Sequence, residues 1–158
     1  MMSDQHRILA IASDHRGHDV VDAIRDHLTN AGWQVHVLAR PDDLEAAVDY
    51  PDAAQAVTTA VADGRAECGV LICGSGIGMS MAANRVHGIR AALVADAHAA
   101  EMSRLHNDAN VLCMGSARLE PDAMNAILDV WLSTDFEGGR HVRRVEKIDA
   151  MRSCEESC

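Results

Sequence analysis

A thiol and three glycines stand together in the segment CGSGIG, which begins at Cys73. Glycines at alternate positions let backbone N–H groups converge on an anion, and a helix that follows them adds positive potential at its N-terminus. The same field favours the thiolate form of a neighbouring cysteine. The segment 73–78 therefore predicts a loop that stabilises negative charge beside a base or nucleophile.

The same segment has an alternative interpretation, because a glycine-rich loop before a helix can also bind a dinucleotide. The fingerprint of such sites, G-x-G-x-x-G, follows the first strand of the fold and needs an acidic residue at the end of the second. Here the loop follows the third expected strand, and the second ends in Leu38-Ala39-Arg40. The pattern thus disfavours a nicotinamide cofactor.

Two other places could supply acid–base groups. Asp14-His15 follows the first expected strand, where such a pair is either a solvated turn or helix cap, or part of a site. His106 stands where a helix is expected to end, so it is either a structural cap stabilised by the helix dipole or an acid or base near neutral pH. The position of Asp14 and His15 at a second strand end favours a functional role for that pair.

A concentration of basic residues lies in the C-terminal segment. Arg140 and Arg144 are four residues apart, so on a helix they share a face and could bind one phosphate together. The alternative is a solvated basic helix. The chain has a formal net charge of -10 and only 14 Lys and Arg residues, so three arginines within residues 140–144 are a local exception.

Short β-rich runs alternate with helical patterns along the chain. Strands are expected at residues 8–13, 33–38, 69–73, 90–95 and 109–114. Helices are expected at residues 17–31, 51–62, 97–106 and 122–132, and another runs from the end of the glycine-rich turn to about residue 85. Near-continuous apolar strands in this alternation predict a three-layer α/β fold, with a five-stranded parallel sheet and helices on both faces.

The strand ends indicate where the site lies, because ligands of open parallel sheets bind beyond the carboxyl ends of the strands. Three of these ends carry polar or reactive groups: residues 13–15 (SDH), the cysteine loop 73–78, and residues 115–118 (GSAR). The length of 158 residues suits one domain, expected at 1–150, followed by a flexible C-terminal tail at 151–158.

Composition limits the partners and the compartment. An acidic chain repels nucleic acid and anionic lipid, so neither is expected as a partner. No apolar run approaches the roughly 20 residues of a membrane span. An odd number of cysteines suits reduced thiols in the cytoplasm better than a disulfide framework; they are Cys68, Cys73, Cys113, Cys154 and Cys158. The last two lie in CEESC, whose spacing is wrong for the usual metal or redox pair.

Several of these segments together resemble the ribose-5-phosphate isomerase B family, which includes galactose-6-phosphate and allose-6-phosphate isomerases. The resemblance runs from Ile8 to about Ile148. Its carriers are SDH (13–15), DYP (49–51), the long run from LICGSGIG to SRLHNDANVL (71–112), and EGGRH (137–141). The order and spacing of the middle blocks are highly specific to this family.

The resemblance implies an aldose–ketose isomerase that acts through a cis-enediolate, with ribose 5-phosphate and ribulose 5-phosphate as substrate and product, in the pentose phosphate pathway of carbohydrate metabolism. It implies a Rossmann-like sheet, no metal and no cofactor. It also implies a homodimer, or a dimer of dimers, whose active sites use both subunits. The C-terminal helix would extend to the partner subunit, and His106 and Asn107 would arrive from that partner.

Site residues carry over from the family one by one. The catalytic residues implied are Cys73 as the enolising base, Ser75 beside the enediolate oxygen, His106 for opening the furanose ring, and Asp14. The residues implied to bind sugar, oxyanion or phosphate are His15, Tyr50, Gly74, Gly76, Ile77, Gly78, Asn107, Arg140 and Arg144. One loop thus supplies both the base and the oxyanion donors.

Three departures from the family pattern concern the substrate. Arg16 stands where the family has a small residue, so it is either an extra anion contact or a surface charge. Arg118 is shifted by one position within GSAR, and the stretch ARPDDLEAAV replaces the usual short glycine-containing turn. These changes keep a four-carbon substrate such as erythrose 4-phosphate, or a six-carbon allose or galactose 6-phosphate, open as alternatives.

Two alternatives of another class remain. The fold could equally support a non-catalytic module that binds phosphosugars. A thiol-based redox protein would need Cys68 and Cys73 to pair, but these residues are expected at opposite ends of one strand, too far apart for a disulfide.

Overall fold

The computed structural model describes residues 7–39 and 48–151. Its five strands form one parallel sheet in the order β2-β1-β3-β5-β4. The strands are β1 (Ile8–Ser13), β2 (Gln34–Ala39), β3 (Cys68–Cys73), β4 (Ala91–Leu93) and β5 (Val111–Gly115). The helices are α1 (His18–Asn30), α2 (Tyr50–Ala62), α3 (Ile77–Ala83), α4 (Ala97–Asn107), α5 (Pro121–Ser133), the 3-10 turn η1 (Gly139–His141) and α6 (Val142–Asp149).

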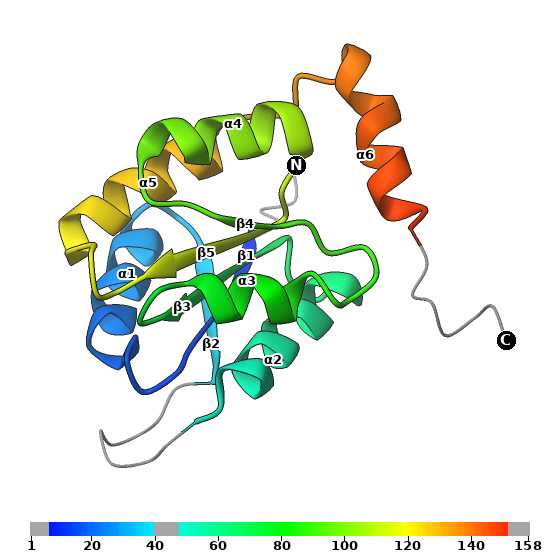
Figure 1. Cartoon of the computed structure of the whole chain (residues 1–158). Helices are drawn as coiled ribbons and strands as arrows, with labels where there is room; N and C mark the ends of the chain where they lie inside the picture. Colours follow the sequence, from blue (N-terminus) through cyan, green and yellow to red (C-terminus); the bar gives the residue numbers. More distant parts are fainter. Residues whose placement is uncertain (1–6, 40–47, 152–158) are drawn as a thin grey trace, which may run out of the picture.

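Helices cover both faces of the sheet, as the sequence predicts. Helices α1, α4 and α5 lie on one face, and α2 and α3 on the other (Figure 1). Alternate side chains of each central strand enter the two cores: Val70 and Ile72 pack toward the first face, and Leu71 and Cys73 toward the second. The three-layer Rossmann-like architecture is therefore confirmed, and Cys73 belongs to the α2–α3 side.

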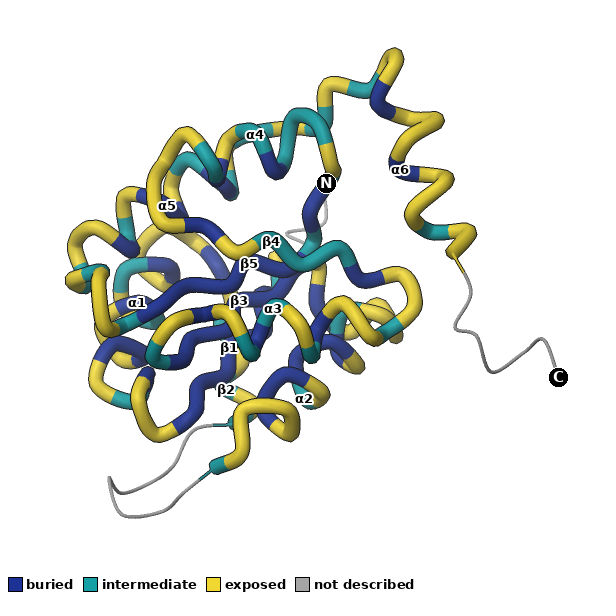
Figure 2. The backbone as a smooth tube through the Cα atoms, viewed as in Figure 1, coloured by how far each residue is buried: buried dark blue, intermediate teal, exposed yellow. Residues whose placement is uncertain are grey.

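The edge strands differ from the expectation of continuously apolar strands. Strands β1, β3 and β5 are almost wholly buried, whereas β2 alternates between half-buried and exposed residues (Figure 2). The expected strand 90–95 is shorter, at Ala91–Leu93, and the Leu93 side chain is 43% exposed. An edge strand has a hydrogen-bonded neighbour on one side only, so less of its length is fixed and covered.

Helix α6 stands apart from the three layers (Figure 1). Most of its residues are exposed, and Val145 is its one buried residue (Figure 2). Its extension to a partner subunit stays a prediction. Most of the stretch ARPDDLEAAV and the tail from residue 152, with Cys154 and Cys158, lie outside the described residues.

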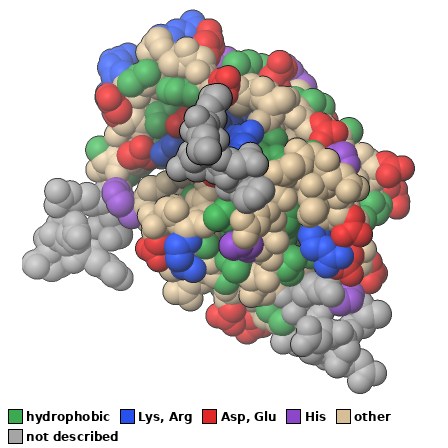
Figure 3. Space-filling view, turned by 180° about the vertical axis from the view of Figure 1, so that it is seen from behind, with side chains coloured by type: hydrophobic (Ala, Val, Ile, Leu, Met, Phe, Trp, Pro, Cys, Tyr) green, Lys and Arg blue, Asp and Glu red, His purple; other side chains and the backbone are tan. Residues whose placement is uncertain are grey.

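The surface carries mixed charge. On the face turned away from the view of Figure 1, the basic patches are separate from one another and adjoin acidic side chains (Figure 3). Among the described residues, no helix combines the length and apolar character that crossing a membrane requires.

Candidate active site

Cys73 ends strand β3, and the turn before α3 wraps around its sulfur. The residue is only 5% exposed. The Gly76 N–H donates a hydrogen bond to Cys73 Sγ at 3.1 Å. The structure thus places the expected base inside the glycine-rich loop, with a backbone donor aimed at its sulfur.

Glycine is required where this loop meets the end of β5. Gly76 has a φ of 76°, and a Cβ there would lie 2.5 Å from Leu93 Cδ1 and 3.0 Å from the carbonyl carbon of Met114. At Gly115 a Cβ would lie 2.7 Å from the carbonyl carbon of Ser75. The two backbones therefore touch directly, which no residue with a side chain allows.

Asp14 acts as a turn cap after β1. Its Oδ1 accepts hydrogen bonds from the N–H groups of Arg16 at 2.8 Å and Gly17 at 3.3 Å, and the residue is 6% exposed. The Asp14 N–H donates to the carbonyl of Ile72 at 3.2 Å, which joins this turn to β3. The structure therefore shows the capping role that the sequence left open, beside the cysteine loop.

Ser116 ties three strand ends together, and sequence reasoning gave it no role. Its Oγ donates to the Arg16 carbonyl at 2.6 Å, and its N–H donates to the Cys73 carbonyl at 2.9 Å. The Ala117 N–H donates to the Gly74 carbonyl at 3.0 Å. The hydroxyl in the GSAR segment was the available signal. We call the turns after β1, β3 and β5 (14–17, 74–76 and 116–118) the carboxyl-edge loops.

Two arginines belong to the carboxyl-edge loops. The stem of Arg16 lies against Gly74, where an added Cβ would be 2.7 Å from Arg16 Cδ. Arg118 is exposed in the turn after β5. Within 7–39 and 48–151, neither guanidinium forms an ion pair with an acidic side chain. Both departures from the family pattern therefore fall at the same edge as Cys73.

Tyr50 covers the start of α3 from the side. It is the first residue of α2, and its ring packs on Gly78, where a Cβ would be 2.8 Å from Tyr50 Cε2. The residue is 43% exposed. Ser75 Oγ, one residue before Gly76, accepts a hydrogen bond from the Ile77 N–H at 3.2 Å. These residues, with His15 in the turn after β1, lie in or beside the turns at the carboxyl edge of the sheet.

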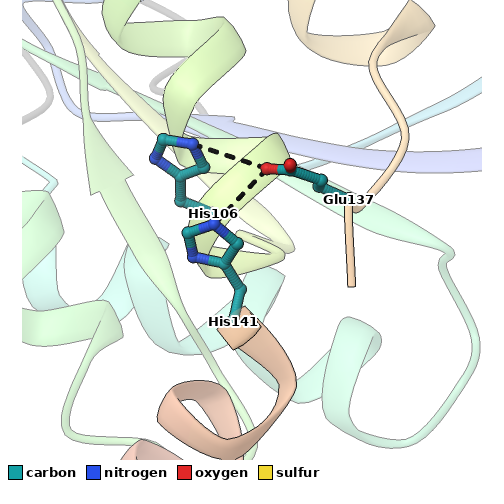
Figure 4. Close-up of side chains that lie close together, drawn as sticks. All are labelled: His106, Glu137 and His141. Atoms are coloured by element: carbon teal, nitrogen blue, oxygen red, sulfur yellow. Dashed lines mark ion pairs between the residues drawn. The ribbon is translucent and has the colours of Figure 1, made fainter. Parts of the chain in front are cut away.

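A second group forms where α4 ends. Glu137 Oε2 lies 3.7 Å from His106 Nε2 and 3.3 Å from His141 Nε2 (Figure 4). The two imidazole rings stack, with centroids 4.3 Å apart and an interplanar angle of 8°. The Glu137 N–H also donates to the Leu105 carbonyl at 3.1 Å, which fixes this segment to α4. We call His106, Glu137 and His141 the histidine corner.

Burial makes His141 the neutral member of the histidine corner. The residue is 3% exposed, and burial together with the nearby His106 lowers its pKa, against a raising effect of Glu137. The three ligand atoms of this group lie within 4.8 Å of one another.

The phosphate-binding candidates lie next to the histidine corner. Arg140 is in the 3-10 turn η1, and Arg144 is in the first turn of α6, so they belong to adjoining helical segments rather than one α-helix. Arg140 Nε lies 3.4 Å from His141 Nε2. A hollow of about 280 Å³ opens between α4, β4 and α6, and Asn107, Arg90 and Ile148 are among its lining residues.

The two groups lie at opposite edges of the sheet. In the β3–β5 ladder, Gly69 pairs with Val111 and Cys73 with Gly115. His106 stands just before β5, at the amino edge, while Cys73 is at the carboxyl edge. The four-residue offset along β3 alone spans about 13 Å. The described chain therefore does not bring the histidine corner to the cysteine loop.

Among the described residues, the cysteines form no disulfide. Cys68, Cys73 and Cys113 are free and buried. Cys68 and Cys73 are the first and last residues of β3, as the sequence predicts. Burial raises the pKa of the Cys68 thiol to about 12 and raises that of Cys113 as well.

Comparison with known proteins gives one consistent family. Residues 9–148 match the family model described as ribose/galactose isomerase. The chain is 41% identical over 143 residues to ribose-5-phosphate isomerase B of Escherichia coli, covering 90% of this chain and 95% of that protein. It is 43% identical over 141 residues to a putative sugar phosphate isomerase of Bacillus subtilis, covering 89% and 93%.

Solved structures agree with the sequence matches. The type B ribose 5-phosphate isomerase of Trypanosoma brucei superposes with a TM-score of 0.86 at 44% identity, covering 92% of this chain and 99% of that one. The ribose-5-phosphate isomerase B of Clostridium thermocellum superposes with a TM-score of 0.85 at 42% identity, covering 90% and 95%.

Proposed function

The chain belongs to the ribose/galactose isomerase family, and we propose that it interconverts ribose 5-phosphate and ribulose 5-phosphate through a cis-enediolate. The observation that carries this proposal is the cysteine loop. A buried thiol accepts a backbone N–H at 3.1 Å and is surrounded by a turn whose glycines touch the end of β5. Such a site combines a base with fixed donors for a developing oxyanion.

In the proposed reaction, the Cys73 thiolate removes the proton from C2 of the open-chain aldose. The electron pair of that C–H bond forms the enediolate, and negative charge develops on the carbonyl oxygen. The Gly76 N–H is engaged by the sulfur, so the oxyanion donors proposed are the other N–H groups of the loop and the Ser75 hydroxyl. The Cys73 thiol then returns its proton to C1, while a proton moves from O2 to O1.

The remaining residues have supporting roles in this proposal. His106 opens the furanose ring, Asn107 contacts the sugar, and Arg140 with Arg144 binds the phosphate. At the carboxyl edge, the substrate contacts proposed are Asp14, His15, Tyr50 and the backbone of Gly74, Ile77 and Gly78, together with Arg16 and Arg118. Phosphate binding far from C1 and C2 supplies orientation energy for the reacting carbons.

We also propose a homodimer, or a pair of dimers, in which each active site uses both subunits. The two halves of the site lie at opposite edges of one chain, so a second copy must bring a histidine corner to each cysteine loop. Exposed apolar side chains support this assembly: Met81 on α3 is 67% exposed, and Leu93 and Ile148 are each 43% exposed. The free, buried cysteines support a reducing, cytoplasmic location.

The reaction is tested by NMR in D₂O with no added metal or nucleotide. Purified protein should convert ribose 5-phosphate to ribulose 5-phosphate and exchange the C2 proton with solvent. Binding of the phosphosugar without exchange would leave only a binding module. Kinetics with erythrose 4-phosphate, ribose 5-phosphate and allose 6-phosphate in parallel test the substrate, and a clear preference for another sugar would overturn ribose 5-phosphate.

The shared site is tested by mixing two inactive variants. Cys73→Ala and His106→Ala subunits, unfolded together and refolded at equal ratio, should regain roughly a quarter of the wild-type activity, because half of the dimers are mixed and each of these holds one intact site. Each variant refolded alone is the control. If the mixture stays as inactive as its components, the shared site is wrong.

A further inference from the structure

Glu137 and His141 surround His106 but have no role in the reaction as written above. We propose that they are positioning residues, which hold the His106 ring in one orientation with Nε2 protonated, so that Nδ1 exchanges the proton during ring opening. This inference rests on the proposed function of His106. It gives Glu137 and His141 a role that the proposed reaction does not already include.

Orientation comes from the stack. The His106 side chain is 39% exposed on the last turn of α4, where an isolated imidazole could occupy several rotamers. The His141 side chain is only 4% exposed, so the surrounding atoms hold its ring in place. Parallel rings 4.3 Å apart place His106 flat against this ring and restrict its rotation. A catalytic ring that is already oriented loses less entropy when it reacts.

Glu137 selects the tautomer of the His106 ring. An ionised carboxylate only accepts hydrogen bonds, so a ring nitrogen that faces it is favoured in its N–H form. Glu137 Oε2 lies 3.7 Å from His106 Nε2 and 3.3 Å from His141 Nε2 (Figure 4). The 3.3 Å contact with His141 is within hydrogen-bond range, and the 3.7 Å contact with His106 is a longer electrostatic contact. The His106 Nδ1 then carries the lone pair that a base needs.

Charge makes the carboxylate available to His106. Burial and the neighbouring His106 lower the pKa of His141, so His141 stays neutral and does not neutralise Glu137. The same arrangement, in which a carboxylate orients an imidazole through one ring nitrogen, occurs in serine hydrolase triads.

Arg140 connects this device to the phosphate. Arg140 Nε lies 3.4 Å from His141 Nε2, the nitrogen that also faces Glu137. One nitrogen cannot accept from Arg140 and donate to Glu137 in the same tautomer. An anion that engages Arg140 therefore removes the competitor and favours the contact of His141 with Glu137.

The test is a double-mutant cycle on ribose 5-phosphate isomerisation. We expect Glu137→Gln to lower kcat about 10-fold, with little change in KM, because the His106 ring loses the carboxylate that holds its tautomer. In His106→Ala, the further change Glu137→Gln should have no effect. Glu146→Gln, an exposed carboxylate on α6, is the matched control and should retain wild-type kinetics.

The stack is tested separately from the carboxylate. His141→Phe keeps an aromatic surface and should preserve most of the activity that His141→Ala loses, with thermal unfolding of both variants showing that they fold. Losses that multiply in the His106→Ala background, or a change in KM alone, overturn the positioning role. A wild-type protein with no isomerase activity overturns the proposed function first, and the positioning role with it.

Discussion

The carboxyl-edge loops and the histidine corner are built from different materials. In the loops, backbone groups make the contacts: the N–H groups of Ser116 and Ala117 donate to the carbonyls of Cys73 and Gly74, and glycines allow the chains to touch. In the corner, side chains make them, and the Glu137 side chain at its centre is 56% exposed. One region is fixed by the sheet, and the other by an ion pair and a ring stack.

This difference follows from what each region must do. An enediolate needs several donors at once, and a backbone loop held by three strands presents them without reorganisation. The proposed ring opening and phosphate binding use single side chains, which can be carried on helix ends. The proposed base therefore lies at an edge held by backbone contacts, while the residues proposed to capture the substrate lie at helix ends held by side-chain contacts.

The largest effect is expected when the Cys73 thiol is removed from the carboxyl edge and the backbone of the loop is left in place. Cys73→Ala and Cys73→Ser should lower kcat at least about 10³-fold, because the loop loses its base but keeps its donors. The thermal unfolding midpoint should change little in comparison. Steady-state kinetics and calorimetry measure the two quantities. Near-wild-type turnover in both variants would remove Cys73 as the base.

The next largest effect is expected from a steric clash in the same loop. In Gly76→Ala the new Cβ meets Leu93 and Met114 in a left-handed backbone, so we expect about 1–3 kcal/mol of overpacking in addition to about 1–2 kcal/mol of backbone strain. Displaced donors should also lower kcat about 10²-fold. Gly64→Ala is the matched control, since its φ is 72° but nothing lies within 4 Å of its Cβ.

Urea unfolding of both glycine variants separates these contributions. Gly64→Ala should show the backbone strain alone and keep full activity. Equal losses of stability in the two variants would mean that the close approach of the cysteine loop to β5 adds no steric cost at Gly76.

The sequence predicts the carboxyl edge better than the histidine corner, and the reason is physical. Residues 13–15, 73–78 and 115–118 are strand ends, and parallel topology alone brings strand ends to one edge. Glu137 and His141 approach His106 through a turn that follows α5, and no periodicity encodes that approach. The spacing of four residues between Glu137 and His141 was the available signal, within the segment EGGRH.

Strand limits show the same division. The central strands follow from their apolar runs, whereas the edge strand β4 is shorter than its apolar sequence suggests because only β5 pairs with it. The opposite placement of Cys73 and His106 follows from the order of elements. The proposal that a second chain brings them together rests on family resemblance and on this geometry, since one sequence does not encode an assembly on its own.

A smaller effect is expected when the end of α6, the helix next to the histidine corner, loses its contact with Arg90. Arg90 donates two hydrogen bonds of 3.0 Å to the Asp149 carboxylate at the end of α6 and one of 3.0 Å to Asp108. Arg90→Gln should raise KM several-fold to about 10-fold with little change in kcat, because α6 carries Arg144 and loss of uniform binding appears in KM. Arg65→Gln, which removes an exposed ion pair, is the control. A fall in kcat alone would contradict this assignment.

The smallest expected effect concerns Cys68, at the opposite end of β3 from Cys73, and changes stability only at alkaline pH. Burial raises the pKa of Cys68 from an ordinary value of 9.0 to about 12, so between these values the unfolded chain loses the thiol proton while the folded chain keeps it. The folded state then binds more protons, and stability falls as pH rises, by up to about 1.4 kcal/mol per pH unit. Urea unfolding at pH 8 and pH 10.5 should show this loss, and Cys68→Ala should reduce it without changing activity at pH 7. An unchanged slope in Cys68→Ala would assign the alkaline loss to other groups, of which Cys113, also buried with a raised pKa, is the first to test.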